Sequence, residues 1–449
     1  MHMPSPKPAN LSSEHPFSKN PHVTLFRLSF PVLISLIAEP LTSLVDTAFV
    51  MRLGAESLAA LGVGAVSLSS LFWIFNFLGI STQTEVAYAE GNNDRSRSVK
   101  MSSLALILSG ACGLLVILAG IPLTSLLATL VGASGTIHDG AVEYIFWRWL
   151  GAPAILITLT SCGALRGLQD MRSVLWIALG INSINILLDP ILIFGIGPIP
   201  ELGIAGAAVA SVIAYWIGAI WSVWIIKRRI GWSFKVDFGA FRKLLGVGAD
   251  LFIRTGALNI FLLLTTREAT HGGADVGAAH QTIRQVWMFG TFVLDAFAVT
   301  GQSLVAYFLG SNQFRSARKV ACVVCLWSFW AGCAVGLVMW MGSEVLVTLL
   351  VPLSAIPYFY SAWMTAIIVQ PLNALAFATD GLHWGSGDYR YLRNAVIVAT
   401  TVGAVVLLAG PHNLTWIWIA TGFWISVRAV LGVIRIWPGI GKSPFKIIN

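Results

Sequence analysis

Long apolar runs alternate with short polar segments along almost the whole chain. Each run has about 20 residues or more, enough for an α-helix to cross a bilayer. The predicted spanning helices lie near residues 24–50, 60–89, 101–125, 140–164, 174–196, 203–226, 246–268, 277–309, 317–341, 353–379, 391–410 and 413–436. The pattern therefore predicts an all-α integral membrane protein with twelve transmembrane helices.

A basic segment, residues 227–245, follows the sixth run and divides the chain almost in half. We therefore expect two six-helix lobes, residues 23–226 and 246–436. The segments outside them, residues 1–22 and 437–449, are expected to be cytoplasmic tails. The first of these is polar and rich in proline and serine, which is typical of a flexible segment, and it lacks the apolar core of a signal peptide.

The two halves contain an internal repeat. A shift of 219 residues places STQTEVAYAEG (81–91) on TGQSLVAYFLG (300–310), and a shift of 218 places RGLQDMR (166–172) on WGSGDYR (384–390). Six predicted helices separate equivalent points, and an even number keeps the direction of the chain. The lobes should therefore form two bundles related by a pseudo-two-fold axis along the membrane normal. Transporters of this design bind substrate between the halves and alternate access by rocking them.

Composition and charge support the membrane assignment. Of the 449 residues, 56% are hydrophobic and only 11% are charged, too few charges for the surface of a soluble domain. Most of the 28 lysines and arginines fall in the tails, in the central segment and in the loops on one side, which places both termini in the cytoplasm. We expect a monomeric, multi-pass protein of the inner cell membrane that contacts lipid and binds no nucleic acid.

Enzyme chemistry is disfavoured. The sequence contains no nucleotide-binding loop, no metal-ligand spacing and no nucleophile–base constellation. The five cysteines fall in apolar stretches without the spacing of a disulfide framework or a zinc site. We expect no cofactor and no bound metal other than a coupling ion.

The first apolar run carries two carboxylates, Glu39 and Asp46. They are seven residues apart, about two helical turns, so they share a face. A charge at the bilayer centre costs at least about 2.5 to 3.5 kcal/mol, which a chain accepts when the group works in an interior cavity. The alternative is a carboxyl group tied to a polar neighbour for packing alone. Pro31 and Pro40 add bend points because each removes a backbone hydrogen bond.

The fifth run, ALGINSINILLDPILIF, places Asn182, Asn185 and Asp189 on one face. Such a polar seam can join helices by hydrogen bonds worth about 0.6 to 2 kcal/mol each. It can also form a coupling site with Asp46, because two carboxyl groups in one pocket raise each other's proton affinity. The Asn185 carbonyl could instead help a sodium ion to replace its water shell. We favour a site for a proton or sodium at Asp46, Asn185 and Asp189.

The second lobe differs from the first. The positions equivalent to Glu39 and Asp46 are not acidic there, whereas Asp295 takes the place of Asn76. Arg284 lies eleven residues before Asp295, about three turns, so the two share a face and could partly compensate each other. The candidate residues of a substrate cavity are Asn76, Asn182, Arg284 and Asp295.

Several segments are distinctive: VDTAFVMRLGAESLAAL in the first helix, NSINILLDPILIFGIGPIPELGIAGAAVAS at 182–211 and GAAHQTIRQVW at 277–287. They resemble the multidrug and toxic compound extrusion (MATE) transporters. DLFIRTGAL (250–258) and DGLHWGSGDYRYLRNA (380–395) look like the DNA-damage-inducible, DinF-like branch. The resemblance covers nearly the whole of both lobes. It implies twelve helices in two bundles that export organic, often cationic and amphipathic, compounds as protons or sodium ions flow inward.

The resemblance also implies roles for single residues. Asp46 matches the coupling acid of the family's first helix, and Asn185 and Asp189 match its partners on the fifth. Ser211 stands where relatives often have threonine, and Pro31 matches a proline at which the helix bends. The main expectation is therefore a secondary antiporter that works by alternating access.

Two observations limit the resemblance. Glu39 matches no family position and rests on local reasoning alone. The sodium-coupled, NorM-like pattern has acids in the seventh and tenth helices, whereas this chain has no acid at the matching position of the seventh helix and Asn373 at the tenth-helix position, which favours coupling through the first lobe. Two alternatives stay open: an exporter of organic anions, in which Arg284 or Arg254 faces the anion, and a lipid-carrier flippase of related two-lobe design.

Overall fold

The computed structural model describes residues 15–234 and 238–446, so parts of both expected tails and of the central basic segment lie outside the described residues. In the described part every regular element is a helix. Within it, ten helices are long and apolar enough to cross a membrane, and two further spans are helix pairs bent by 52° and 47°. The predicted total of twelve spans is confirmed.

The first lobe contains α2 to α9. Their bounds are α2 Pro21–Met51, α3 Ala55–Ile74, α4 Asn76–Gly91, α5 Arg95–Leu130, α6 Gly135–Trp149, α7 Ala152–Gly167, α8 Met171–Phe194 and α9 Gly203–Arg229. The helices α3 and α4 together make one span, and so do the bent helices α6 and α7.

The second lobe contains α10 to α17. Their bounds are α10 Phe238–His271, α11 Ala274–Gly310, α12 Phe314–Met341, α13 Ser343–Leu350, the short 3-10 helix η1 Leu353–Ala355, α14 Ile356–Ile368, α15 Gln370–Gly385, α16 Tyr389–Ala409 and α17 Leu414–Ile436. The bent pair of this lobe runs from η1 through α14 to α15.

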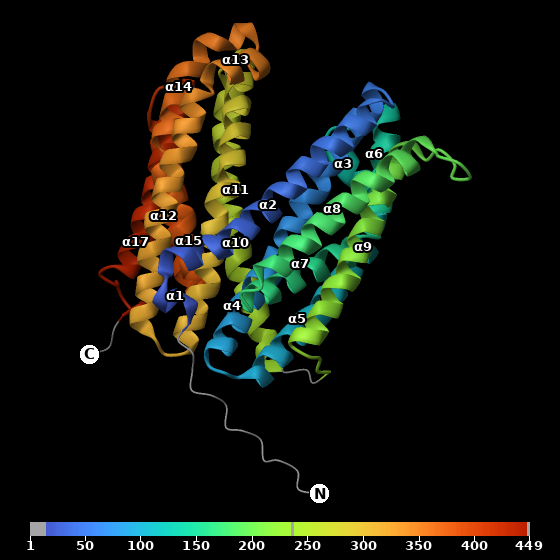
Figure 1. Cartoon of the computed structure of the whole chain (residues 1–449). Coiled ribbons are helices and arrows are strands. Elements are labelled where there is room, and N and C mark those ends of the chain that lie inside the picture. Colours follow the sequence, from blue (N-terminus) through green and yellow to red (C-terminus); the bar gives the residue numbers. More distant parts are fainter. Residues whose placement is uncertain (1–14, 235–237, 447–449) are drawn as a thin grey trace, which may run out of the picture.

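The two lobes lie close together at one end of the molecule and diverge toward the other (Figure 1). We call these the closed end and the open end. Helix α2 runs between the lobes: Val32 packs with Ala296 and Val299 of α11, whereas Val50 packs with Tyr144 of α6. One helix therefore contacts the second lobe near its start and the interior of the first lobe near its end.

Two repeat-equivalent glutamines join the lobes at the closed end. The Gln83 amide on α4 donates to the Val299 carbonyl and the Ser303 hydroxyl of α11, both at 2.8 Å. The Gln302 amide on α11 donates to the equivalent carbonyl and hydroxyl groups of α4, at 2.8 and 2.9 Å. Both glutamines are buried. The repeat found in the sequence thus appears as a reciprocal set of hydrogen bonds, with the predicted pseudo-two-fold symmetry.

The hydroxyl groups of this seam continue the symmetric pattern. Thr84 donates to the Trp384 carbonyl at 2.9 Å, and Ser303 donates to the Arg166 carbonyl at 2.8 Å. Each hydroxyl therefore accepts a hydrogen bond from a glutamine amide of the other lobe and donates one to a backbone carbonyl of a third helix. This arrangement supplies hydrogen-bond partners to buried polar groups, which the lipid interior cannot do.

Two repeat-equivalent glycines bring the backbones into contact next to the seam. A Cβ atom on Gly91 would lie 1.9 Å from the Tyr307 carbonyl oxygen, and one on Gly310 would lie 2.1 Å from the Tyr88 carbonyl oxygen. Any side chain at these positions would meet backbone atoms. Glycine is thus required for the lobes to approach this closely.

The segment boundaries differ from those expected. Residues 16–19 form a short helix, α1 Pro16–Lys19, within the stretch expected to be a flexible tail, and α2 already begins at Pro21. The basic segment 227–245 is largely helical, because α9 continues to Arg229 and α10 begins at Phe238. The expected boundaries lie where each apolar run ends and charged residues begin. The helices continue past those points because their terminal turns contain charged residues.

The short helix α1 contacts both lobes. Phe17 is fully buried in a cluster with Phe308 of α11 and Phe445 of the C-terminal segment. The Nδ1 atom of His15 accepts a hydrogen bond from the Phe17 backbone N–H at 3.1 Å and so caps the helix. Its Nε2 atom lies 2.9 Å from Oε1 of Gln169, between α7 and α8 of the first lobe. This segment therefore anchors the start of α2 at the closed end.

We expect Gly310→Ala to separate the lobes at the closed end, because overpacking costs about 1 to 3 kcal/mol and here the clash is with backbone. Spin labels at the exposed positions Asn92 and Gln313, with the native cysteines replaced, should report a longer distance. Gly246→Ala is the matched control, since no atom lies within 4 Å of its added Cβ. An unchanged distance in Gly310→Ala would contradict the role of this contact.

We expect docking of α1 to weaken in acid. Burial lowers the pKa of His15 below 6.5, although the Gln169 hydrogen bond opposes this shift. A proton on Nδ1 would remove the cap, so the stabilisation is complete above the unfolded pKa, about 6.5, and is lost as the pH falls through the lowered value. Hydrogen exchange of residues 16–22, corrected for intrinsic rates, should accelerate at low pH. His15→Asn, which can cap without titrating, should remove the dependence.

Candidate functional site

The polar residues predicted on α2 and α8 meet inside the first lobe. The carboxyl groups of Asp46 and Asp189 lie close enough to interact directly. The Asn185 amide nitrogen lies 3.4 Å both from Oδ1 of Asp189 and from the Ser211 hydroxyl of α9. Asp189 is fully buried, and Asn185 and Ser211 are also buried. The structure thus brings four of the five predicted coupling residues together.

The two neighbouring carboxyl groups are arranged so that they can share one proton. Oδ1 of Asp46 and Oδ2 of Asp189 are buried and have no donor among the residues that the structure describes. An ionised carboxylate only accepts hydrogen bonds, so a hydrogen bond between two carboxyl groups needs a proton on one of them. The pair can therefore hold one proton, and it can release that proton only at the cost of bringing two negative charges together.

Glu39, the fifth predicted coupling residue, is exposed and joins the site indirectly. Its Oε1 atom accepts a hydrogen bond from the Tyr215 hydroxyl of α9 at 3.3 Å. The guanidinium group of Arg148, on α6, lies 5.9 Å from the centre of the Tyr215 ring. Arg148 and the buried Tyr144 are within electrostatic range of Asp46.

Sequence reasoning did not select Arg148, Tyr144 or Tyr215. The arginine left a usable signal, because it lies within a predicted spanning run where a charge is costly. The tyrosines left none, since an uncharged side chain in a spanning run carries no comparable cost.

Both prolines of the first helix lie inside a continuous helix. Helix α2 runs from Pro21 to Met51 through Pro31 and Pro40. Pro31 is buried close to the contact with α11, and Pro40 lies between that contact and Asp46. The bends expected at these positions remain predictions.

The candidate cavity residues lie apart from the carboxyl pair. The amide of Asn182 donates to the Ala178 carbonyl of its own helix at 2.9 Å, and Asn76 begins α4. Arg284 donates to the Thr266 hydroxyl at 3.0 Å. No ion pair within 4 Å joins Arg284 to Asp295 in the described part of the chain, so the expected compensation between them is not seen.

A buried ion triad occupies the interior of the second lobe. Oδ2 of Asp380, on α15, accepts hydrogen bonds from Arg254 of α10 and, at 2.8 Å, from Arg428 of α17. The three side chains are at most 8% exposed. Two guanidinium groups on one carboxylate leave an excess of positive charge. Because the partners are 126 and 48 residues apart, no local pattern could have predicted the triad.

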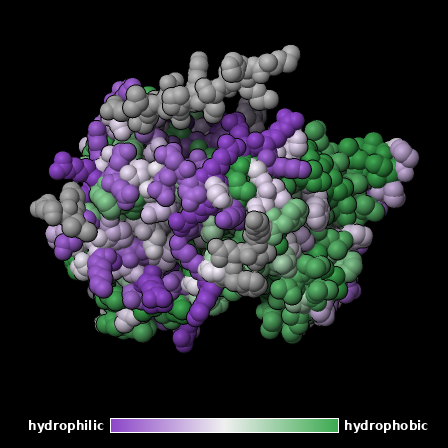
Figure 2. Space-filling model, turned by 90° about the horizontal axis from the view of Figure 1, so that it is seen from below, coloured by the Kyte–Doolittle hydropathy of each residue, from purple (hydrophilic) through white to green (hydrophobic). Residues whose placement is uncertain are grey.

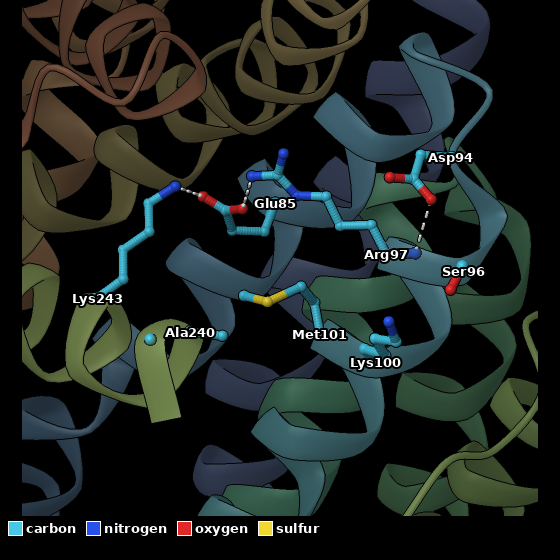
Figure 3. A pocket seen from close by; sticks show the side chains of 9 residues that line it. Glu85, Asp94, Ser96, Arg97, Lys100, Met101, Ala240 and Lys243 are labelled. Carbon is cyan, nitrogen blue, oxygen red and sulfur yellow. Dashed lines mark hydrogen bonds and ion pairs between the residues drawn. The ribbon is translucent and has the colours of Figure 1, made fainter. Parts of the chain in front are cut away.

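A polar pocket of about 310 Å³ lies at the closed end. Glu85 bridges the lobes there: it pairs with Arg97 of α5 at 2.7 Å and with Lys243 of α10 (Figure 3). Asp94 accepts the Arg97 backbone N–H at 3.0 Å and caps α5. Since its carboxylates are engaged with the surrounding chain, we interpret this pocket as an ionic contact between the lobes.

Comparisons with known proteins agree with this architecture. A model of the MatE family matches residues 31–191 and 256–409. Protein DETOXIFICATION 44, chloroplastic, of Arabidopsis thaliana is 28% identical over 445 residues, covering 94% of this chain and 83% of that protein. DNA damage-inducible protein F of Escherichia coli (strain K12) is 28% identical over 426 residues, covering 92% of this chain and 91% of that protein.

Solved structures show the same fold. A MATE protein crystallised in a bent and in a straight conformation matches with TM-scores of 0.84 and 0.83 at 21% identity, covering 92% of this chain and 94% and 95% of that protein. The resemblance found in the sequence is thus confirmed over both lobes. The chain belongs to the MATE family and is a multi-pass membrane transporter of small molecules, not an enzyme.

Proposed function

We propose that this protein is a secondary antiporter that exports organic, cationic and amphipathic compounds in exchange for protons. The observation that carries the proposal is the pairing of the half-buried Asp46 with the buried Asp189, because a hydrogen bond between two carboxyl groups needs one proton. The protein acts as a monomer in the inner cell membrane, and the names of its relatives, which include a multidrug resistance protein and DETOXIFICATION proteins, support export of organic compounds.

The choice of a proton over sodium rests on the donor set. Asn185 turns its amide nitrogen toward the Asp189 carboxylate and the Ser211 hydroxyl, an orientation inferred from the hydrogen-bond network. A sodium ion needs oxygen ligands, so the Asn185 side chain would have to rotate. Protonation needs no such change. Sodium at Asp46, Asn185 and Asp189 is the competing form of the same proposal.

The coupling step acts through α2. With a proton bound, the carboxyl groups of α2 and α8 can stay in contact; without it, two carboxylates in a low-dielectric site repel each other. The same helix packs through Val32 against α11 of the second lobe. Movement of Asp46 is therefore transmitted toward the lobe contact, with Pro31 and Pro40 as the points of bending. The bent and straight crystal forms of the related MATE protein are consistent with such a change.

The closed end faces the cytoplasm in this proposal. Hydrophilic residues gather over that end, which Figure 2 shows from below. Arg95, Arg228 and Arg315 are exposed there, as the positive-inside rule expects of cytoplasmic loops. The present conformation would then be outward-open, ready to release substrate and to take up a proton. Alternating access requires the seam at Gln83 and Gln302 to open in the other half of the cycle.

A second candidate function is export of organic anions. The Arg254–Asp380–Arg428 triad favours it, because its excess positive charge lies inside the second lobe. The near-complete burial of the triad speaks against direct ligand contact in this conformation. A lipid-carrier flippase is less favoured, since the strongly basic central cavity and extra helices that it needs do not match twelve spans with few interior arginines.

We expect Asp46→Asn and Asp189→Asn to abolish coupled export, because neither variant can exchange a proton across the pair. In proteoliposomes with an imposed pH gradient, movement of a fluorescent cationic dye should fall to the rate of protein-free vesicles. Glu56→Gln, which changes an exposed acid at the start of α3, should behave as wild type. Normal dye export by a folded Asp46→Asn protein would exclude the mechanism, and dye movement driven by sodium alone would change the ion.

We expect the transported substrate to be cationic. In the same vesicles, unlabelled lipophilic cations should compete with the dye, whereas small di- and tricarboxylates should not. The reverse outcome, with competition by the carboxylates only, would support export of organic anions and a role for the buried arginines of the second lobe.

A further inference from the structure

An arginine lies near the middle of a membrane span. Arg148 is in the last turn of α6, next to the 52° break between α6 and α7. An arginine at this depth is costly, so its presence calls for a reason. The carboxyl end of α6 favours a cation to a modest extent, because the helix dipole is negative there.

Arg148 has no anionic partner in this conformation. None of the ion pairs in the described part of the chain includes it. Its Nε atom is buried and makes no hydrogen bond. By contrast, Arg254, Arg428 and Arg435 each pair with a buried or half-buried carboxylate. The guanidinium group rests over the Tyr215 ring, a weaker contact that a rotation of the side chain can break.

The groups around Arg148 belong to the carboxyl pair and its surroundings. Arg148 is within electrostatic range of Asp46 of α2, Tyr215 of α9 and Tyr144 of its own helix, and Glu39 and Asp189 neighbour these same residues. Helices α3 and α5 also pack against α6, but they carry their charged residues at their first turns, and His138 at the start of α6 bonds to Ser125.

The charges of this site balance only when one proton is present. Two carboxyl groups with one proton carry a single negative charge, equal and opposite to the charge of the nearby Arg148, although the two form no ion pair in this conformation; Glu39 is exposed and is compensated by water. After the proton leaves, two carboxylates face one guanidinium group. Without Arg148 the deprotonated site would hold two uncompensated negative charges in a low-dielectric interior.

We propose that Arg148 is a positioning residue for coupling: it swings from Tyr215 to the Asp46–Asp189 pair and takes the place of the proton when that proton leaves. This inference rests on the proposed proton antiport. It goes further because it assigns a role in proton release to a cation that belongs to the protein itself. The carboxyl pair can then lose its proton without binding a second ion from solution.

The first test is the pH profile of dye exchange in proteoliposomes. Arg148→Gln should move the pH of half-maximal exchange upward by about one unit or more, since an opposite charge within about 4 to 6 Å changes a carboxyl titration by that amount. Arg148→Lys keeps the charge and should titrate close to wild type. Arg52→Gln, an exposed arginine at the end of α2, is the matched control and should not change the profile.

The second test does not depend on transport. Infrared difference spectra of the purified protein should show the carbonyl stretch of a protonated carboxyl group that disappears in Asp46→Asn. Its titration should move to higher pH in Arg148→Gln and stay near the wild-type position in Arg148→Lys. If exchange is proton-driven but this titration is the same in Arg148→Gln and wild type, the inference is wrong and the antiport stands.

The remaining outcomes separate the two proposals. A shifted titration in a protein that moves no substrate under a pH gradient supports the role of Arg148 and overturns the proposed antiport. The absence of any such carboxyl band overturns both. If Arg148→Gln does not fold, a lysine variant that titrates at higher pH than wild type contradicts the inference, because it retains the charge.

Discussion

The two lobes are held by polar groups that have no alternative partner in a lipid environment. Each of the buried amides of Gln83 and Gln302 donates to a carbonyl and a hydroxyl of the opposite lobe. Since a bilayer core supplies no water to replace these bonds, the seam can open only if water enters as the helices separate. The angle between the lobes and the crossing of α2 both depend on this seam.

The seam is symmetric, but the interiors of the lobes are not. The first lobe places the half-buried Asp46 beside the buried Asp189 with a guanidinium group nearby, whereas the second holds the buried Asp380 between two arginines. The first arrangement can change its protonation, because its carboxyl groups face each other. The second is a buried ion cluster in which Asp380 pairs with both arginines rather than with another carboxyl group. The two lobes thus share one scaffold, but the interior of the first is suited to exchanging an ion and the interior of the second is suited to keeping its ion pairs unchanged.

The sequence predicts the features that depend on length or local spacing. The twelve spans follow from the apolar runs, and the meeting of Asp46 with Asp189 follows from acids on two helices in one lobe. The triad of Arg254, Asp380 and Arg428 could not be predicted from the sequence, because it depends on how helices far apart in the chain pack together. Helix α1 was missed for another reason: its four residues are too few to show any periodicity.

The anchoring of the chain ends bears on how the protein is assembled. Phe17 is among the first described residues to leave the ribosome, yet it shares a buried cluster with Phe308 of the second lobe and with Phe445, which follows the last helix. The start of the chain therefore has no docking site until the second lobe has been inserted. Complete docking also needs the segment after α17, and a polypeptide truncated before that helix would lack Phe445 in the cluster around Phe17.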